Sequence, residues 1–387
     1  MRDVVVIGVG MNKWGELWEV AIRDLIAQSS LKALDDAGID SVDAMYIGCM
    51  SSGLFAEQEH LGSMGPDYSG ICPTPGTRVE SACASGGAAF RSGYMHVASG
   101  MGDLVMVAGV EKMTDVDGGG ATFALATAAD QEYEVYNGVT FPGLYAMMAN
   151  HHMNKYGTTR DHMAQVSVKN HANGYNNPLA QFRMKLTLDK VKNAVMVADP
   201  LTLLDCSPIT DGSAAVILAS ADKAKELGIK KRLVKVIGSG HASDTIQLSQ
   251  REDLSSIPST TVAAAEALKM AGKKIDDIDF AEVHDCFSIA EIMVIEALGI
   301  AEKGKGGFVT MDGVTAIDGK FPVNPSGGLK SKGHPVGATG VAQIVELTKQ
   351  IRGEGDKGRQ LKKADIGLAQ NMGGSGASSV VHILEGN

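Results

Sequence analysis

The two halves of the sequence repeat the same order of predicted strands and helices. The first half opens with an apolar strand at residues 4–10, followed by a helical pattern at residues 22–37. Residues 234–240 and 261–271 repeat this strand and helix in the second half. The repetition predicts an internal duplication. Because the predicted strands are apolar along most of their length, they indicate an α/β fold whose sheets are covered by helices on both faces.

A long insertion interrupts the first copy of the repeat. In the second half, the last two predicted strands, residues 366–370 and 379–384, are joined by a short glycine-rich turn. In the first half, the strand at residues 104–110 finds its partner only at residues 213–218. An excursion of this length is usually functional, although a decorative subdomain would give the same pattern. The expected organisation is an N-terminal half at residues 1–116 and 201–222, an inserted loop domain at residues 117–200, and a C-terminal half at residues 223–387.

The insertion carries a local cluster of basic residues. The whole chain has a formal net charge of −10, yet this cluster is accompanied by a single acid, Asp189. A basic patch suits a phosphorylated substrate, and a solvated surface would explain it equally well. The residues concerned are Arg183, Lys185, Lys190 and Lys192.

The composition argues against several classes of protein. The acidic net charge argues against nucleic acid as a partner. The sequence shows no run of about 18 apolar residues and no basic leader before an apolar stretch, so we expect neither a membrane span nor a signal peptide. The five cysteines are odd in number and have no Cys-x-x-Cys spacing. This pattern favours reduced thiols in a cytoplasm over a disulfide framework or a metal site.

The first strand ends in Gly8-Val9-Gly10, which invites the hypothesis of a dinucleotide site. Lys13 stands where that fingerprint has its third glycine, and no apolar helix begins there. We therefore reject a dinucleotide cofactor.

A cysteine lies at a predicted strand-to-helix turn. Residues 78–82 form a short β-prone run, Cys83 follows, and small residues lead into the next helical pattern. Free N–H groups and the positive dipole at a helix start stabilise a thiolate, so we expect the pKa of Cys83 to lie below about 8.5. Backbone N–H groups of this turn could also face a developing oxyanion. A buried structural cysteine is the alternative, and a nearby base is needed to decide between the two.

The duplication supplies candidate bases for this cysteine. The turn around His334 opens the helix at residues 341–351 and matches the Cys83 turn of the first half. Pseudo-twofold packing would therefore bring Cys83 and His334 together. His284 and Cys286 follow a strand that we expect at the centre of the second sheet, at the end where open α/β folds place their ligands. Three other histidines show no partner spacing and are expected on the surface or in loops: His151, His152 and His171.

On these motifs the chain resembles the thiolase superfamily over essentially its whole length. The shared motifs are the nucleophile turn at residues 80–86, Asp211-Gly212-Ser213-Ala214-Ala215, Asn324-Pro325-Ser326-Gly327-Gly328 and Gly333-His334-Pro335. The run His284-Asp285-Cys286-Phe287 is similar to sterol-carrier-type and archaeal thiolases, where bacterial enzymes have Asn-Glu-Ala-Phe. The resemblance implies a duplicated five-layer α/β/α/β/α fold, with an inserted loop domain that covers coenzyme A.

The chain departs from many thiolases at one catalytic position. Their late Cys-x-Gly motif supplies a second cysteine, and here Asn371-Met372-Gly373 stands in its place. In the sterol-carrier-type branch, the cysteine of the His-Asp-Cys-Phe run is thought to substitute. The resemblance therefore implies that Cys286 is the acid and base of the second step.

The resemblance also implies a mechanism. Cys83, deprotonated by His334, would take the acyl group of one acyl-CoA as a thioester. Cys286 would then remove a methyl proton from acetyl-CoA, and the carbanion would attack the acyl-enzyme. His334 and His284 would donate hydrogen bonds to the enolate oxygen, and the backbone N–H groups of Cys83 and Gly373 would stabilise the oxyanion of the acyl-enzyme.

Further site residues are expected around this centre. Tyr145 and Phe287 are expected to contact the substrate, and the basic residues of the insertion are expected to bind the coenzyme A phosphates. Coenzyme A thioesters are substrates in this scheme, so we expect no separate cofactor and no metal.

The family implies an activity and partners. We expect an acetyl-CoA C-acetyltransferase that interconverts two acetyl-CoA with acetoacetyl-CoA and CoA, at the entrance to the mevalonate pathway of isoprenoid biosynthesis. We expect a cytoplasmic homodimer or homotetramer. Association with 3-hydroxy-3-methylglutaryl-CoA synthase and a small zinc-ribbon/OB-fold protein is also expected.

Three other functions remain open at this point. A decarboxylating 3-ketoacyl synthase also uses one cysteine and two histidines, but it usually follows the first histidine with Gly-Thr and needs no second thiol. A Cys-His thioester hydrolase would not need the duplication. A non-catalytic acyl-CoA-binding or scaffold subunit is the third alternative, and the presence of both Cys83 and His334 weighs against it.

Overall fold

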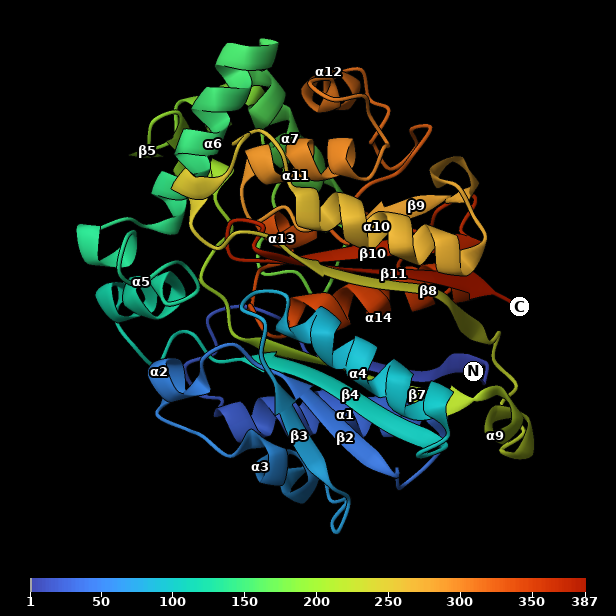
Figure 1. Cartoon of the computed structure of the whole chain (residues 1–387). Helices are drawn as coiled ribbons and strands as arrows, with labels where there is room; N and C mark the ends of the chain where they lie inside the picture. Colours follow the sequence, from blue (N-terminus) through green and yellow to red (C-terminus); the bar gives the residue numbers. More distant parts are fainter. Residues whose placement is uncertain (1) are drawn as a thin grey trace.

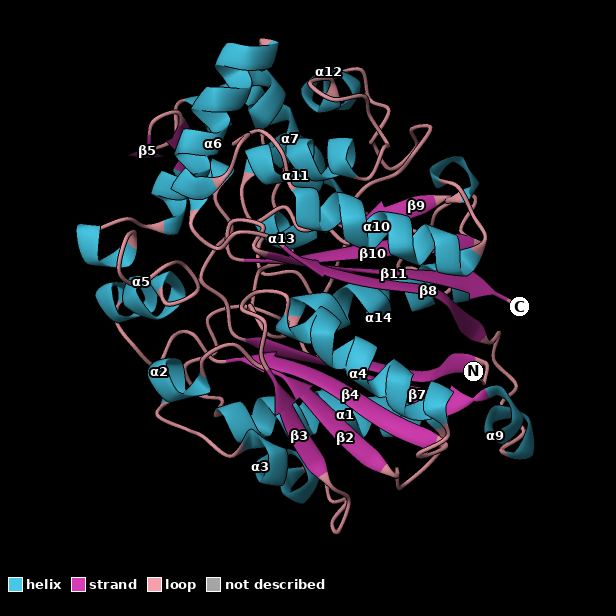
Figure 2. Ribbon diagram, viewed as in Figure 1, coloured by secondary structure: helices cyan, strands magenta, loops and turns pink. Residues whose placement is uncertain are grey.

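The computed structural model describes residues 2–387, which form two half-sheets with helices outside and between them (Figures 1 and 2). The strands of the first half-sheet are β1 (Val4–Met11), β2 (Ala44–Gly48), β3 (Gly76–Val79), β4 (Leu104–Glu111) and β7 (Gly212–Ser220). The strands of the second are β8 (Val234–Ser243), β9 (Phe280–Glu282), β10 (Ile366–Gly373) and β11 (Ser378–Gly386). The hydrogen-bonded order is β3-β2-β4-β7-β1-β8-β11-β10-β9. The halves meet where β1 pairs with β8 through two residue pairs.

The helices complete five layers. The N-terminal half contains α1 (Ile22–Ala37), α2 (Ser52–Ala56), α3 (Leu61–Tyr68), α4 (Ser85–Ser99) and α9 (Ala221–Glu226). The C-terminal half contains α10 (Pro258–Ala271), α11 (Ser288–Ala297), α12 (Gly306–Met311), α13 (Gly328–Ser331) and α14 (Thr339–Arg352). Figure 1 shows α4 and α14 between the half-sheets, α1 on the outer face of the first and α10 on the outer face of the second. The predicted duplicated α/β fold with five layers is confirmed.

Equivalent glycines explain why the strand-helix pair recurs. In β1, a Cβ atom at Gly10 would overlap the backbone oxygen of Ser29 in α1. In β8, a Cβ atom at Gly240 would overlap the backbone oxygen of Ala263 in α10 in the same way. Glycine in these strands therefore lets a helix backbone approach the sheet closely. Close packing of α1 therefore explains the Gly-x-Gly run of β1, and no nucleotide-binding role is needed for these glycines.

The pairing of strands also repeats. In the first half, β2 pairs in parallel with β3 and β4. In the second half, β9 pairs in parallel with β10, and an isolated parallel bridge between Ala281 and Val323 stands where β3 would be. Each half closes with an antiparallel pair, β4 with β7 and β10 with β11. The two copies thus differ mainly in the length of the segment between the strands of this last pair.

The chain leaves the first half-sheet after Glu111 and returns to it at Gly212. The segment between them contains α5 (Gly118–Ala126), η1 (Val135–Asn137), α6 (Phe141–Tyr156), α7 (Arg160–Gly174), α8 (Leu188–Lys192), β5 (Met196–Ala198), β6 (Leu201–Thr202) and η2 (Leu203–Asp205). Two further 3-10 turns, η3 (Leu248–Gln250) and η4 (Ile275–Asp277), belong to the C-terminal half. Helices α6 and α7 pack on α11, so the excursion covers the C-terminal half (Figure 1). Among residues 2–387, no helix combines the length and apolar character needed to cross a bilayer.

Two expectations from the sequence are wrong. The strand before His284 is β9, which lies at the edge of the sheet rather than at its centre. His152 and His171 are buried in α6 and α7, not on the surface or in loops. His152 lies between Thr158 and Glu296, with ring nitrogens 2.8 Å and 3.2 Å from their side-chain oxygens. Only the tertiary fold supplies Glu296, so the sequence showed no partner.

The two central helices cross at their N-terminal ends through glycine. A Cβ atom at Gly86 of α4 would lie 2.7 Å from the backbone oxygen of Gly337. A Cβ atom at Gly340 of α14 would overlap the backbone nitrogen of Gly87. The two helix starts are therefore in backbone-to-backbone contact, which fixes the positions of the turns that precede them.

Gly340→Ala should lower the free energy of unfolding by about 3 kcal/mol, because the added methyl group meets backbone atoms that cannot move aside. The measurement is denaturant unfolding followed by fluorescence. Gly118→Ala is the matched control, since a Cβ atom there meets nothing within 4 Å and its φ is not positive. Equal stability of the two variants would contradict the tight crossing.

Candidate active site

Cys83 lies on a sharp turn between β3 and α4, as the sequence predicts. The preceding residue, Ala82, has a φ of 49°, a left-handed conformation that alanine rarely adopts. Ser85 holds the turn together, since its hydroxyl accepts from the N–H of Ser81 at 2.9 Å and donates to the carbonyl of Ala82 at 2.6 Å. Strained backbone of this kind persists where the surroundings determine it, and it is common at active sites.

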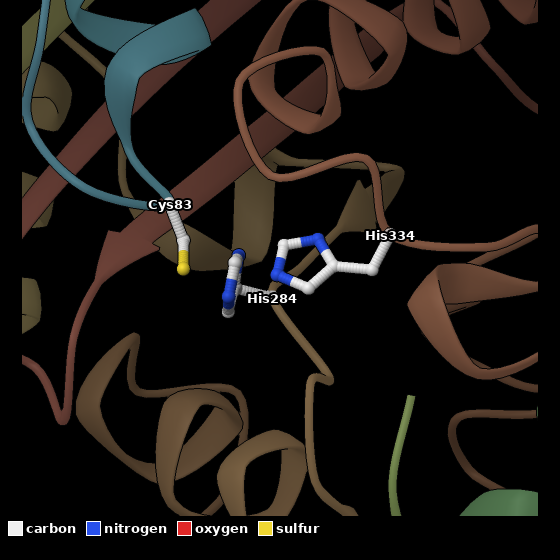
Figure 3. Close-up of side chains that lie close together, drawn as sticks. All are labelled: Cys83, His284 and His334. Carbon is white, nitrogen blue, oxygen red and sulfur yellow. The ribbon is translucent and has the colours of Figure 1, made fainter. Parts of the chain in front are cut away.

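Two histidines from the other half of the chain face this cysteine. The thiol of Cys83 and one ring nitrogen of each of His284 and His334 all lie within 4.8 Å of one another (Figure 3). The two imidazole rings meet edge to face, with centroids 4.9 Å apart. His284 follows β9, and His334 lies in the turn before α14. The convergence expected from the duplication is thus present in the structure.

The hydrogen bonds of His334 fix which ring nitrogen can act as a base. Its Nδ1 lies 2.7 Å from the hydroxyl of Thr339, and that hydroxyl donates to the carbonyl of Pro335 at 3.0 Å. Because the hydroxyl hydrogen is committed to a carbonyl, the hydroxyl accepts from Nδ1–H. The lone pair of neutral His334 is then on Nε2, which suits a general base.

The electrostatics of the resting site differ from the expectation. Burial raises the pKa of Cys83 to about 12, and the backbone N–H of Gly374 only partly offsets this. Burial also lowers the pKa of His284 to about 3 and that of His334 well below its ordinary value. The prediction of a helix-lowered thiol pKa is therefore wrong for the resting protein, because desolvation outweighs the helix terminus. Cys83 and both histidines are neutral until a proton moves between them.

A pocket of about 330 Å3 opens onto the cysteine. Its wall is mostly apolar, and the excursion supplies part of it. The residues that line it are Cys83, Met113, Thr122, Leu125, Thr140, Phe141, Pro142, Tyr145, Val197, Cys206, Ser207, Pro208, Ile209, Cys286, Phe287, His334 and Gly374. A larger hollow of about 440 Å3 lies elsewhere, around Ile275 and Phe321, and contains none of the converging residues.

Cys286, Tyr145 and Phe287 form one side of this pocket. The rings of Tyr145 and Phe287 stack with centroids 4.5 Å apart, and the Tyr145 hydroxyl donates to the carbonyl of Gly374 at 2.9 Å. Cys286 is buried, and this burial raises its pKa well above the ordinary thiol value. A thiol in this environment stays protonated at neutral pH, so it is a proton donor before it can be a base.

A buried polar network holds the loop that carries His284 and Cys286. Asp285 accepts from the N–H of Leu329 at 2.7 Å at the start of α13. Asn170 of α7 donates to Asp285 at 2.6 Å and to Glu291 at 2.8 Å. Burial, then the nearby charge of Glu291, raises the pKa of Asp285 to about 6. The excursion thus contributes to the position of the loop that carries His284 and Cys286 as well as to the pocket wall.

Gly373 and the four basic residues were predicted as site residues, but they do not line the pocket. The backbone N–H groups beside the Cys83 thiol belong to Gly374 and to Cys83 itself, whereas Gly373 lies one residue earlier in β10 and does not line the pocket. The oxyanion role of Gly373 stays a prediction. None of the four basic residues lines the pocket either, and Lys192 pairs with Asp161 at 2.6 Å. Arg183 and Lys185 both contact Tyr175 on the surface.

The sequence left several functional neighbours unidentified. Three further residues contact the converging side chains: Thr339 contacts His334, Gly374 contacts Cys83 and the amide of Asn371 contacts His284. Thr339 had a usable signal, because it stands one turn after His334 at the start of a helix. The sequence identified Asn371 only as the residue that stands in place of the second cysteine. The role of its amide had no signal, since it depends on contacts with segments that are far apart in the sequence.

The alkylation rate of Cys83 by iodoacetamide should rise steadily with pH. Because the pKa of Cys83 is raised to about 12, the thiolate fraction should increase about tenfold for each pH unit below that value. Peptide mass spectrometry between about pH 7 and pH 10 measures this rate. The exposed Cys72 is the internal control. A plateau below about pH 8 would show instead a preformed thiolate-imidazolium pair.

Comparisons with known proteins agree with this geometry. The family model described as thiolase, N-terminal domain, matches residues 4–222, and thiolase C-terminal domain-like matches residues 240–386. The acetyl-CoA acetyltransferase of Methanothermobacter thermautotrophicus is 57% identical over 386 residues, which cover 99% of this chain and 100% of that protein. Sterol carrier protein 2 of Oryctolagus cuniculus is 34% identical over 397 residues, which cover 97% of this chain and 71% of the relative.

One solved structure supports the fold alone. It is described as an Ltp2-ChsH2(DUF35) aldolase, and it superposes with a TM-score of 0.85 over 99% of this chain and 98% of that one, at 21% identity. With two family models spanning both halves and full-length relatives well above 30% identity, the chain belongs to the thiolase family and is an acyltransferase.

Proposed function

We propose that the chain is an acetyl-CoA C-acetyltransferase, which condenses two acetyl-CoA to acetoacetyl-CoA and CoA and catalyses the reverse thiolysis. One observation carries the proposal. Cys83, His284 and His334 converge within 4.8 Å on a mostly apolar pocket that also contains Cys286. A full-length archaeal relative named acetyl-CoA acetyltransferase, at 57% identity, supports acetyl-CoA as the substrate.

The first half-reaction transfers the acetyl group to the protein. Cys83 gives its proton to Nε2 of His334, and its sulfur attacks the thioester carbonyl of acetyl-CoA. The departing CoA thiolate takes a proton from Cys286, which is a thiol at rest because burial raises its pKa. The products are CoA, acetyl-Cys83, a Cys286 thiolate and a protonated His334, so charge and protons balance.

The second half-reaction forms the carbon-carbon bond. The Cys286 thiolate removes a methyl proton from a second acetyl-CoA and becomes a thiol again. The resulting enolate attacks acetyl-Cys83, and the released Cys83 sulfur recovers its proton from His334. His284, whose ring lies beside Cys83, would stabilise the enolate oxygen while this charge develops (Figure 3).

The proposal extends to the assembly and the cellular setting of the protein. Strand β3 is only partly buried at the sheet edge, which supports a homodimer or homotetramer through that edge. The solved neighbour named above is a complex of two proteins, so association with another chain has a precedent on this fold. We propose that this chain associates with a small zinc-ribbon/OB-fold protein and with 3-hydroxy-3-methylglutaryl-CoA synthase. We also propose that it acts in the mevalonate pathway and in the cytoplasm. Surface basic residues of the excursion remain the proposed site for the coenzyme A phosphates.

Incubation with acetyl-CoA should add one acetyl group to Cys83, visible by intact mass and lost on addition of CoA. Cys83→Ala should carry no adduct while its fold is unchanged, because the thiol makes the covalent bond. The same preparation should form acetoacetyl-CoA and cleave it with CoA. An adduct that water removes as fast as CoA would identify a thioester hydrolase instead.

Cys286→Ser should slow condensation by about 10²–10⁴-fold, because a hydroxyl of similar size is a far weaker acid than a thiol. Acetyl-Cys83 should still form and should accumulate. Exchange of acetyl-CoA methyl protons with solvent deuterium, followed by NMR, measures the affected step directly. Cys206→Ser is the matched control, since this thiol also lines the pocket but has no proposed role. Exchange at the parental rate in Cys286→Ser would remove Cys286 from the mechanism.

A further inference from the structure

The side chain of Asn371 has an orientation that two backbone groups determine. Asn371 is buried in β10, at the position where many thiolases have their second cysteine. Its Oδ1 accepts from the N–H of Gly87 at 3.1 Å, and its Nδ2 donates to the carbonyl of Cys83 at 3.0 Å. A backbone N–H can only donate and a carbonyl can only accept, so the oxygen and nitrogen of this amide cannot be exchanged.

This orientation decides the tautomer of His284. The same Nδ2 lies 3.2 Å from Nδ1 of His284. Since Nδ2 is a donor, Nδ1 must accept, and the hydrogen of the neutral ring is then on Nε2. Among the residues that the structure describes, Nε2 is buried without a hydrogen-bond partner. Nε2–H is therefore the group of His284 that remains free to donate to a substrate oxygen, on a ring that lies beside Cys83 and His334 (Figure 3).

The two histidine rings therefore carry opposite hydrogen-bonding groups at Nε2. Thr339 leaves a lone pair on Nε2 of His334, whereas Asn371 leaves a hydrogen on Nε2 of His284. We propose that Asn371 is a positioning residue that holds His284 in its Nε2–H form, which makes the ring a hydrogen-bond donor and prevents the Cys83-His284-His334 cluster from binding a metal ion. The consequence for catalysis rests on the proposed function, but the tautomer and the metal behaviour do not.

The metal part follows from the ligand atoms. One thiol and two imidazole nitrogens within 4.8 Å are the ligand types that Zn²⁺ takes in proteins. Nδ1 of His284 already accepts from Asn371, so Nε2 is the nitrogen left for a metal ion. A zinc-bound Nε2 needs its lone pair, so the hydrogen of His284 would have to move to Nδ1, against the Nδ2–H of Asn371. Turning the amide over would put its oxygen against the Cys83 carbonyl and its nitrogen against the Gly87 N–H. Both hydrogen bonds would be lost, and the buried N–H of Gly87 and the partly buried carbonyl of Cys83 would be left without these partners.

Two substitutions separate the positioning role from general damage. Asn371→Asp keeps an acceptor for the Gly87 N–H and places an acceptor beside Nδ1 of His284, so it should reverse the tautomer. Asn371→Ala removes the constraint. Gln343 offers matched controls, because it is a buried amide of α14 that donates to the carbonyl of Gln370 at 2.8 Å and bonds to neither histidine among the described residues. Gln343→Glu and Gln343→Ala make the same chemical changes near β10.

The first measurement is the tautomer itself. Protein with ¹⁵N-labelled histidine gives ring nitrogen shifts that distinguish Nε2–H from Nδ1–H, and His284→Asn assigns the signals. The parent and both Gln343 variants should show Nε2–H at His284, and Asn371→Asp should show Nδ1–H. Retention of Nε2–H in Asn371→Asp would overturn the proposal.

The second measurement uses Zn²⁺ as the probe and does not depend on enzymatic activity. Zinc chloride is titrated while iodoacetamide labelling of Cys83 is followed by peptide mass spectrometry. Zn²⁺ should protect Cys83 in Asn371→Asp and Asn371→Ala at concentrations about ten- to hundredfold lower than in the parent, the range typical of changes beside a metal-bound histidine. The Gln343 variants should behave as the parent. Equal protection in the parent and Asn371→Ala would overturn the proposal even if Asn371→Asp does not fold.

A kinetic measurement links the tautomer to catalysis. In Asn371→Ala, kcat for condensation should fall by about tenfold, less than the about 10²–10³-fold typical for complete loss of an oxyanion donor. KM should change little. An unchanged kcat in a variant whose tautomer or zinc protection has changed would overturn the catalytic consequence. If the parent itself forms no acetoacetyl-CoA, the proposed function fails, while the tautomer and zinc measurements still decide the role of Asn371.

Discussion

The contact between the starts of α4 and α14 is the constraint on which the site depends. Gly86 and Gly340 allow the two backbones to touch, and any side chain there would push the helices apart. The turn before α4 carries Cys83 and the turn before α14 carries His334, so the contact between the two helix starts brings these two side chains close together. Glu111 of β4 ties the same region together, since its carboxylate accepts from the N–H groups of Met50 and Gly337. Backbone contacts and hydrogen bonds thus fix the positions of the turns that carry the site.

Close packing at this centre also sets its chemistry. The same burial raises the pKa of Cys83 and lowers those of the two histidines, so every group starts neutral. A charged intermediate in such a place must be matched by a second charge nearby, because separated charges are costly where water is excluded. In the proposed reaction, proton transfer from Cys83 to His334 satisfies this condition, because the thiol and a ring nitrogen of His334 lie within 4.8 Å. The two half-sheets and the excursion exclude water from the site. This exclusion keeps the groups neutral at rest, and it requires that charges formed during the proposed reaction appear as a close pair.

The sequence was a good guide wherever the duplication applied. Two equivalent turns predicted that Cys83 and His334 meet, and two equivalent strand-helix pairs predicted the layers. It failed where the result depends on a neighbour distant in the chain. The partner of His152 is Glu296, 144 residues away, and the direction of the Cys83 pKa depends on residues of the excursion that bury it. The edge position of β9 was also hidden, because the equivalent of β3 is reduced to a single bridge at Val323.

The contacts at the start of α4 explain why an asparagine at position 371 goes together with a cysteine at position 286. At position 371, one amide satisfies the N–H of Gly87, the carbonyl of Cys83 and Nδ1 of His284 together. A thiol has one weak donor and one weak acceptor, so it could not hold these three groups at once. With an asparagine in this place, the acid and base of the proposed reaction must come from another side of the pocket. Cys286 is the group that we propose for it, since it lines the pocket two residues after His284 on the loop that Asp285 anchors to α13.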